Sequence, residues 1–229
     1  MDSNETRALA AGRQTTDWTE DWVTGWAVAR GRSVERNGDA WGVEVGDAYR
    51  DREYVIGSPS VAEATRLVRL LTGPRDWLTV LGERDPAVDR ALAPLQAMSR
   101  VETLMEIRDL AASPRKNTHH RGHGVQDGQL GLGEENGVAE VTITIDEVVA
   151  ACGYAVVSGE ALILDRISTE PQYQRRGLGR RVVEALCEWG SATGAERGLL
   201  VASVEGRALY LTLGWRDVMP VAGYTRAAA

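Results

Sequence analysis

Residues 172–181 read QYQRRGLGRR and place two glycines and four arginines in one short segment. Glycine lets a backbone approach a ligand closely because it has no Cβ. Arginine supplies charge-assisted hydrogen-bond donors for anions. Three interpretations fit this composition: a phosphate cradle, a nucleic-acid-binding patch and an ordinary exposed loop. The flanking sequence and the overall charge distinguish among them.

The segment lies between a predicted strand and a predicted helix. ALILDRIS (161–168) is typical of a strand, and residues 179–193 have the periodicity of a helix that ends before Gly194. The first amides of a helix have no internal partners, and the helix dipole favours an anion beside them. This order favours the phosphate cradle. The segment alone is weak support, because neither the dinucleotide fingerprint nor the P-loop motif is complete.

The composition narrows the class of protein. The 229 residues carry a formal net charge of -7 with an estimated pI of 5.1, which argues against nucleic-acid binding. The apolar runs are too short to span a bilayer, and the polar N-terminus is unlike a secretory signal, so we expect a cytoplasmic protein. The two cysteines, Cys152 and Cys187, do not make a disulfide framework and are expected to be reduced thiols.

Residues 1–110 are predicted to form an N-terminal α+β domain. Trp18, Trp22 and Trp26 recur on one face of a predicted helix over 17–30, which indicates a packing face or, alternatively, a lid over a substrate cleft. The elements expected after it are strands at 41–46 and 52–57, a helix at 60–71, a strand at 77–82, a helix at 85–95 and a strand at 101–107.

A segment without periodicity, residues 111–137, is expected to be a flexible linker. It contains the three histidines, His119, His120 and His123, but no cysteine or carboxylate completes a usual zinc spacing, so no metal site is predicted. Beyond it we expect a domain over 138–229. Its predicted elements are strands at 141–146, 150–157 and 161–168, the helix at 179–193, a strand at 198–203, a helix at 206–214 and a last strand from Trp215.

Two motifs of this C-terminal domain resemble the GNAT acyltransferase superfamily. Residues 174–179 match its Q/R-x-x-G-x-G/A signature, and ALYLTLGW (208–215) resembles its A-x-x-LY-x-x-LGF ending, with Trp215 in the place of Phe. The resemblance implies an α/β (α+β) GNAT fold, a mixed and mostly antiparallel sheet flanked by helices. It also implies that the glycine turn binds the pyrophosphate of acyl-CoA. The N-terminal domain is then either a degenerate GNAT-like repeat or a separate domain on the acceptor side.

The same resemblance assigns roles to single residues. The Ile167 amide lies where the family polarises the thioester carbonyl, Thr169 where the backbone pairs with pantetheine, and Tyr210 where a tyrosine protonates the thiolate. Ser203 stands where many members carry Asn. The cofactor-binding residues expected in this way are Ile167, Ser168, Thr169, Gln174, Arg175, Arg176, Gly177, Leu178, Gly179, Arg180 and Ser203.

The general base is less well defined. Some members use a glutamate at the position of Ile163, which cannot accept a proton. Asp165 lies two residues further on the same face of the strand and is the preferred acid-binding or base-like residue. Glu160 and a water chain are alternatives, and an ion pair of Asp165 with Arg166 or Arg181 is the structural alternative.

These residues predict an N-acetyltransferase that moves an acetyl group from acetyl-CoA to a primary amine of a small molecule or amino-acid-like metabolite, with Tyr210 as general acid. A longer acyl-CoA or an acyl group on a carrier protein are alternative donors, and a non-catalytic acyl-CoA sensor is the alternative function. No metal, nucleic acid or membrane partner is expected, and a homodimer is left open.

Overall fold

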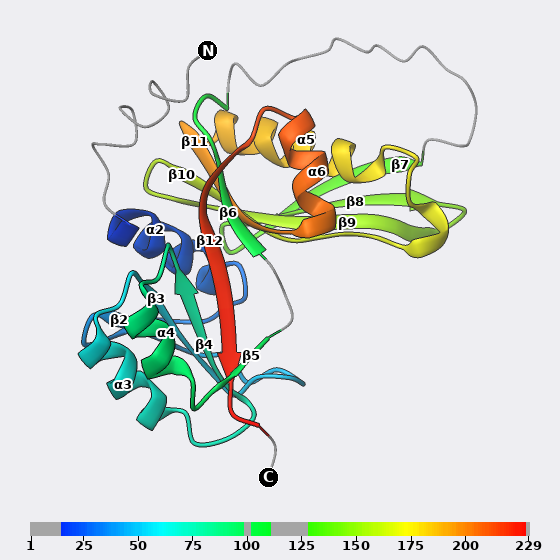
Figure 1. The fold of residues 1–229 in the computed structure, drawn as a ribbon. Coiled ribbons are helices and arrows are strands. Elements are labelled where there is room, and N and C mark those ends of the chain that lie inside the picture. Colours follow the sequence, from blue (N-terminus) through cyan, green and yellow to red (C-terminus); the bar gives the residue numbers. More distant parts are fainter. Residues whose placement is uncertain (1–14, 99–101, 111–127, 228–229) are drawn as a thin grey trace. The chain divides into compact units, whose positions relative to one another are not determined.

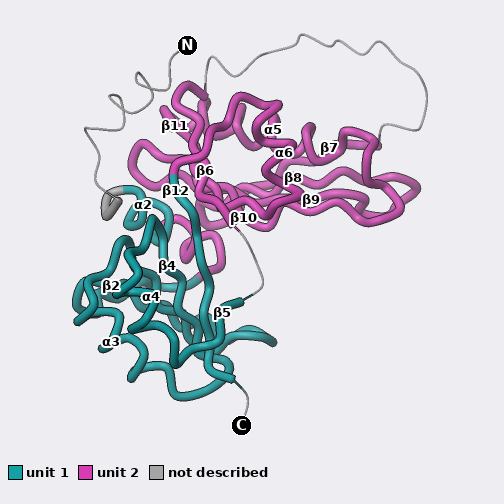
Figure 2. The backbone as a smooth tube through the Cα atoms, viewed as in Figure 1, with its two compact units in different colours: residues 1–24, 32–101, 219–229 teal, residues 25–31, 102–218 magenta. Residues whose placement is uncertain are grey.

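The computed structural model describes residues 15–98, 102–110 and 128–227. The chain divides into two compact units, which Figure 2 colours separately. Unit 1 comprises residues 1–24, 32–101 and 219–229, and unit 2 comprises residues 25–31 and 102–218.

Unit 1 contains a sheet in the order β1-β2-β3-β4-β12 with helices α3 and α4 (Figure 1). Residues 15–24 of helix α2 (Thr15–Val28) also belong to this unit. Strands β3 and β4 are parallel and are joined through α3, whereas the other neighbours pair antiparallel. The elements are β1 (Val34–Asn37), β2 (Ala40–Glu44), β3 (Arg52–Gly57), α3 (Val61–Leu70), β4 (Asp76–Leu81), α4 (Pro86–Leu92), β5 (Gln96–Ala97) and residues 219–225 of β12 (Arg216–Thr225).

Local sequence signals explain the helices of unit 1. The Ser60 hydroxyl accepts a hydrogen bond from the Glu63 amide and so caps α3. Asp85 caps α4 in the same way, with Pro86 in the first turn, where no amide donor is needed. The helices pack on a core whose largest fully buried members include Ile56, Leu67, Leu71, Leu78 and Leu92.

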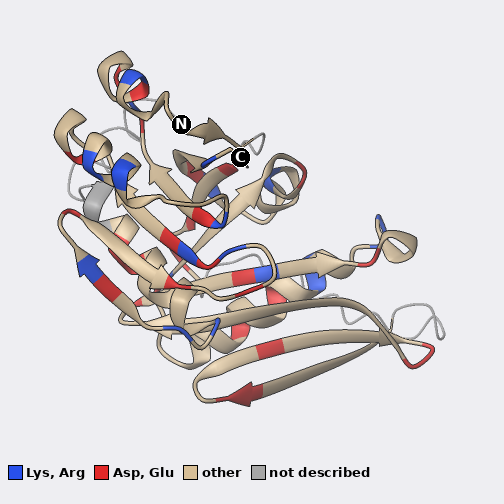
Figure 3. Ribbon diagram, turned by 90° about the horizontal axis from the view of Figure 1, so that it is seen from below, with Lys and Arg blue, Asp and Glu red and all other residues tan. Residues whose placement is uncertain are grey.

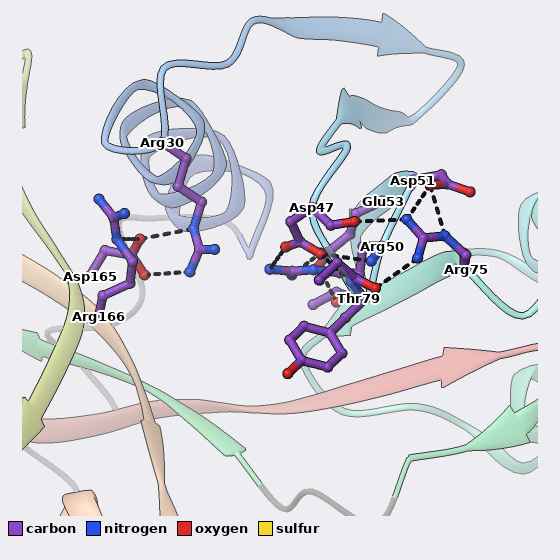
Figure 4. Close-up of polar contacts among 11 residues, drawn as sticks. Arg30, Asp47, Arg50, Asp51, Glu53, Arg75, Thr79, Asp165 and Arg166 are labelled. Atoms are coloured by element: carbon purple, nitrogen blue, oxygen red, sulfur yellow. Dashed lines mark hydrogen bonds and ion pairs between the residues drawn. The ribbon is translucent and has the colours of Figure 1, made fainter. Parts of the chain in front are cut away.

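The buried carboxylate of Glu53, in the sheet of unit 1, has polar partners at both oxygens. Glu53 accepts a hydrogen bond of 2.6 Å from the Thr79 hydroxyl and forms an ion pair with Arg50. Figure 4 shows these residues beside Asp47, whose side chain accepts hydrogen bonds from the Tyr49 and Arg50 amides. These contacts fix the turn that leads into β3.

Unit 2 contains a sheet in the order β6-β11-β10-β9-β8-β7, with α5 and α6 on one face (Figure 1). Strands β10 and β11 are parallel, and the other neighbours are antiparallel. The elements are β6 (Glu102–Ile107), β7 (Gln129–Glu135), β8 (Val138–Ile145), β9 (Val148–Ser158), β10 (Ala161–Thr169), the short η2 (Pro171–Tyr173), α5 (Leu178–Ala192), β11 (Arg197–Ser203) and α6 (Val204–Thr212).

Helix α2 (Thr15–Val28) ends in unit 2. A Cβ at Gly25 would lie 2.2 Å from Cγ1 of Ile163, so this position needs glycine where the helix crosses β10. The predicted tryptophan face is present, because Trp18, Trp22 and Trp26 are all buried. Their burial agrees with the packing interpretation.

The two units repeat one order of elements. In unit 1, β1, β2 and β3 are antiparallel, and α3 leads to the parallel strand β4 and then to α4. In unit 2, β8, β9 and β10 are followed by α5, the parallel strand β11 and α6. The shared order supports the expectation that the N-terminal half is an altered copy of the same fold.

Each sheet is completed by a strand from the other half of the sequence. Strand β6, which follows α4, pairs antiparallel with β11 in unit 2. Residues 221–225 of β12, which follows α6, pair antiparallel with β4 in unit 1. The units therefore differ from the expected domains 1–110 and 138–229, because long-range strand pairing reassigns these segments.

The expected linker is partly a strand. Gln129–Glu135 form β7 at the edge of the sheet and pair with β8 along their whole length. The glycines at 131 and 133 and the exposed side chains hide this strand from a search for hydrophobic alternation. The remainder of the linker, including His119, His120 and His123, lies outside the described residues.

Candidate active site

The turn that precedes α5 has unusual backbone geometry. Arg175 and Gly177 have φ angles of +62° and +80°, both in the left-handed region. Such turns direct successive N–H groups into a concavity that binds anions. Gly177 is the N-cap residue of α5 and gives no side-chain cap, and the first intrahelical bond runs from the Arg181 amide to the Gly177 carbonyl. The amides of residues 178–180 therefore lie at the open end of the helix.

Side-chain contacts hold this turn in place. The Gln174 amide donates to the Thr169 carbonyl at 3.2 Å, which connects the turn to the end of β10. Arg176 donates to the Gln172 carbonyl, and its guanidinium lies 5.3 Å from the Tyr173 ring. Apart from its chain neighbours and the nearby backbone of α5, no atom of the described residues lies within 4 Å of the place that a Cβ at Gly177 would occupy, so its surroundings are open.

The turn also contacts α6. A Cβ at Gly179 would lie 3.3 Å from Cδ2 of Leu209 and 3.5 Å from Oγ1 of Thr169. Arg180 donates to the Thr212 hydroxyl at 2.8 Å. The end of β10, the start of α5 and helix α6 therefore meet at one place in unit 2.

Strands β10 and β11 pair over a short distance. Among the described residues, their parallel ladder joins 161–163 with 197–199, although β10 continues to Thr169 and β11 to Ser203. The equivalent pair in unit 1 is joined along all of β3. Among the described residues, the main-chain groups of β10 beyond Ile163 are therefore not paired with β11, and this stretch includes Ile167 and Thr169. The Thr169 carbonyl accepts the Gln174 side chain.

A bulge interrupts β10 in this stretch. The register with β9 shifts between Asp165 and Ser168, and Arg166 has a φ of +52°. A left-handed residue other than glycine costs about 1–2 kcal/mol. Such irregularities accumulate at functional sites. Ile167 lies inside the bulge, and the Ser168 hydroxyl is 3.3 Å from the Cys152 sulfur.

Tyr210 occupies a buried position in α6. Its side chain is 7% exposed, and its ring lies 6.0 Å from that of Trp215. Burial, with a smaller effect of the nearby Cys187 thiol, raises the pKa of Tyr210 to about 12. The described residues offer its hydroxyl no hydrogen-bond partner. The phenol is therefore protonated at neutral pH, and its proton is free for a ligand.

The two cysteines are free thiols. Burial raises the pKa of Cys187 to about 12, so it is not a thiolate at neutral pH. A covalent cysteine mechanism through Cys187 is disfavoured for this reason.

Ser203 has a structural function that was not predicted from the sequence. Its hydroxyl oxygen accepts a hydrogen bond of 3.2 Å from the Gly206 amide and caps α6. A Cβ at Gly206 would lie 3.2 Å from Cε2 of Tyr210, so the first turn of α6 also supports the tyrosine ring. The cap therefore stabilises the helix that carries Tyr210.

Asp165 is held in an ion pair. Its Oδ1 accepts a hydrogen bond of 3.1 Å from Nη2 of Arg30, and its Oδ2 lies 2.9 Å from Nε of Arg30 and 3.4 Å from Nε of Arg166 (Figure 4). The sequence predicted Arg166 as one alternative partner, but Arg30 was missed because it lies 135 positions away in the sequence. Ile163, the position of the family glutamate, is fully buried.

Comparison with family models decides the identity of this part of the chain. Residues 134–217 match the model described as the acetyltransferase (GNAT) domain. These residues form a GNAT domain. The glycine turn, the bulge of β10 and Tyr210 all lie within this GNAT domain.

Solved structures share the fold of the GNAT domain and of the residues before it. A GCN5-related N-acetyltransferase from Kribbella flavida matches with a TM-score of 0.66 and 13% identity, covering 94% of this chain and 96% of the other. A GCN5-related N-acetyltransferase-like protein from Streptococcus suis has a TM-score of 0.59 and 12% identity, covering 97% of both chains. No curated protein matches the sequence. At these identities the likeness establishes the fold alone.

One further finding concerns membranes. Within the described ranges, no helix has the length and hydrophobicity needed to cross a membrane.

Proposed function

We propose that this protein is an N-acetyltransferase that transfers an acetyl group from acetyl-CoA to a primary amine of a small molecule or amino-acid-like metabolite. The observation that carries this proposal is the glycine turn at the N-terminus of α5, with left-handed residues at 175 and 177 and open surroundings at Gly177. The GNAT domain match over the same residues supports it.

The coenzyme would bind through its negatively charged pyrophosphate and through the amide groups of its pantetheine arm. The pyrophosphate accepts hydrogen bonds from main-chain amides at 175–180, where the positive end of the helix dipole also lies. Arg175 and Arg176 are exposed there and add positive charge. The pantetheine arm then follows β10 where it parts from β11, with Thr169 as its main-chain partner.

The transfer step uses main-chain and tyrosine groups. The neutral amine attacks the thioester carbon, and the Ile167 amide stabilises the oxyanion that forms. When the intermediate collapses, the C–S bond breaks and the thiolate takes the proton of the Tyr210 hydroxyl. The amine releases its own proton to solvent, and Tyr210 is reprotonated from solvent. Asp165 is held in ion pairs with Arg30 and Arg166. A water chain is therefore the better candidate for removing the proton from the amine.

Charge distribution supports a small-molecule acceptor rather than nucleic acid. Lys and Arg are interspersed with Asp and Glu in the view of Figure 3, and the net charge of the chain is -7. A pyrophosphate cradle favours free coenzyme over a carrier protein, whose arm supplies one phosphate. The Tyr210 hydroxyl, which forms no hydrogen bond with the part of the chain that the structure describes, favours catalysis over sensing alone.

An amine panel tests the proposed activity directly. Purified protein is incubated with acetyl-CoA and small primary amines, and coenzyme A release is followed with a thiol reagent, with the acetylated product identified by mass spectrometry. We expect turnover with at least one amine. Binding of acetyl-CoA without turnover of any amine would favour the sensor, and absence of binding would refute the proposal.

We expect one coenzyme site per chain, because the equivalent turn of unit 1 is closed. There Ser60 caps α3 with its own hydroxyl, Pro59 has no amide hydrogen, and β3 stays paired with β4 to its end. Calorimetric titration with coenzyme A should therefore give a stoichiometry of about one. A stoichiometry of two would show that unit 1 also binds.

Ser203→Ala should show whether Ser203 only caps α6 or also contacts acetyl-CoA. Loss of the cap should lower the free energy of unfolding by about 1 kcal/mol. Ser60→Ala is the matched control, because each serine accepts a 3.2 Å bond from the amide three residues later. We expect similar losses of stability in thermal melts, but a higher KM for acetyl-CoA in Ser203→Ala alone. Equal KM values in the two variants would limit Ser203 to its cap.

A further inference from the structure

We infer that Arg30, Asp165 and Arg166 form a positioning cluster that holds the β10 bulge, so that the Ile167 amide stays directed at the thioester carbonyl. This inference rests on the proposed function. Arg30 lies in the turn that follows α2, and Asp165 and Arg166 lie in β10, all in unit 2.

The bulge determines where Ile167 points. Before it, Leu162 and Leu164 face the core under α5, and after it Ile167 packs against the same core. Two residues, rather than one, separate these core positions, which is the effect of the register shift between Asp165 and Ser168. A Cβ at Gly153 would lie 2.4 Å from Cδ1 of Ile167, so the neighbouring strand makes room for this side chain.

The left-handed Arg166 is held on several sides. Its Nη2 donates to the Ala29 carbonyl at 2.7 Å, which joins the bulge to the end of α2. Its guanidinium lies 3.9 Å from the centre of the Tyr154 ring on β9. The Tyr154 hydroxyl in turn donates to Glu140 on β8 at 2.6 Å.

Asp165 connects the two arginines. Its side chain is 11% exposed, its Oδ1 accepts a hydrogen bond from Arg30, and its Oδ2 forms ion pairs with Arg30 and Arg166 (Figure 4). We therefore assign Asp165 a positioning role, in which its carboxylate orients the two arginines and does not contact the substrate. Loss of Arg30 would remove the contact between Asp165 and the segment after α2, and the bond from Arg166 to the Ala29 carbonyl would then be the remaining contact with that segment. The bulge would then relax, because a strained residue persists only while its surroundings hold it.

The test compares Arg30→Met with Arg84→Met. Both arginines are 22% exposed, both pair with an aspartate, and both lie over an aromatic ring, at 5.2 Å from Trp26 and 5.9 Å from Tyr224. Arg84 belongs to unit 1. We expect Arg30→Met to lower kcat by about 10- to 100-fold, since misplacement of a catalytic donor by about 1 Å has effects of this size. The Kd for coenzyme A, which is held at the α5 turn, should change less than about two-fold.

Two further measurements keep the inference open to refutation. Amide hydrogen exchange over residues 163–169 should accelerate in Arg30→Met and in the isosteric Asp165→Asn, but not in Arg84→Met. Arg30→Lys should restore part of kcat. Unchanged exchange and unchanged kcat in Arg30→Met and Asp165→Asn would overturn the inference. Amide hydrogen exchange is measured without substrate. If the wild-type protein shows no turnover, the proposed function is refuted, but the exchange measurement still tests whether the cluster holds the bulge.

Discussion

Gly177→Glu is expected to abolish acetyl-CoA binding, with a loss of affinity of at least about 100-fold, or roughly 2.7 kcal/mol. Gly177 has a φ of +80° and open space where a Cβ would project. A glutamate there strains the turn and places a carboxylate beside the proposed pyrophosphate position. Calorimetry with acetyl-CoA, together with the ligand-induced shift of the thermal midpoint, measures the loss.

The matched control lies at the other end of the same helix. Gly194 has a φ of +99°, and no described residue other than its neighbours in the chain has an atom within 4 Å of its Cβ position. Gly194→Glu therefore introduces the same residue under similar backbone strain. It should lower stability but retain coenzyme affinity. Equal affinity in the two variants would show that the coenzyme does not bind at Gly177.

Tyr210→Phe should leave acetyl-CoA affinity nearly unchanged and lower kcat by about 100-fold, the smaller end of the range for a lost general acid. Tyr224→Phe is the matched control, because both tyrosines are 7% exposed and Tyr224 lies in unit 1. Steady-state kinetics with an amine identified from the panel measure the effect. Equal kcat values in the two variants would remove Tyr210 from the mechanism.

The pH profile provides a second readout for Tyr210. Its pKa is raised to about 12 by burial, against a reference near 10, so the folded protein favours the protonated phenol. This contribution to stability is fully present below pH ~10 and is lost as the pH rises through about 12. In the wild-type protein, kcat should not fall through ionisation of Tyr210 between pH 7 and 10. An alkaline fall near pH 8 that Tyr210→Phe removes would contradict this assignment.

Local features of the site were predictable from the sequence. The helix expected at 179–193 is α5 (Leu178–Ala192), and the strand expected at 161–168 is β10 (Ala161–Thr169). Periodicity and glycine punctuation define both, and the position of the turn between them follows. These signals act over a few residues, and a single sequence displays them directly.

Contacts between distant segments were not predictable in this way. Arg30 meets Asp165 across 135 positions, and Arg216 meets the buried Glu106 across 110. The exchange of β6 and β12 between the units depends on which sheet edge each strand meets. Neither ion pairing nor edge pairing leaves a periodic signal, so the positioning of the bulge emerged only from the structure.

A crystal structure with coenzyme A tests the central claim most directly. We predict one coenzyme per chain, with its pyrophosphate oxygens within hydrogen-bond distance of main-chain amides at 175–180 and its pantetheine arm along β10 beside Ile167 and Thr169. Coenzyme bound elsewhere, with this turn facing solvent, would contradict the account.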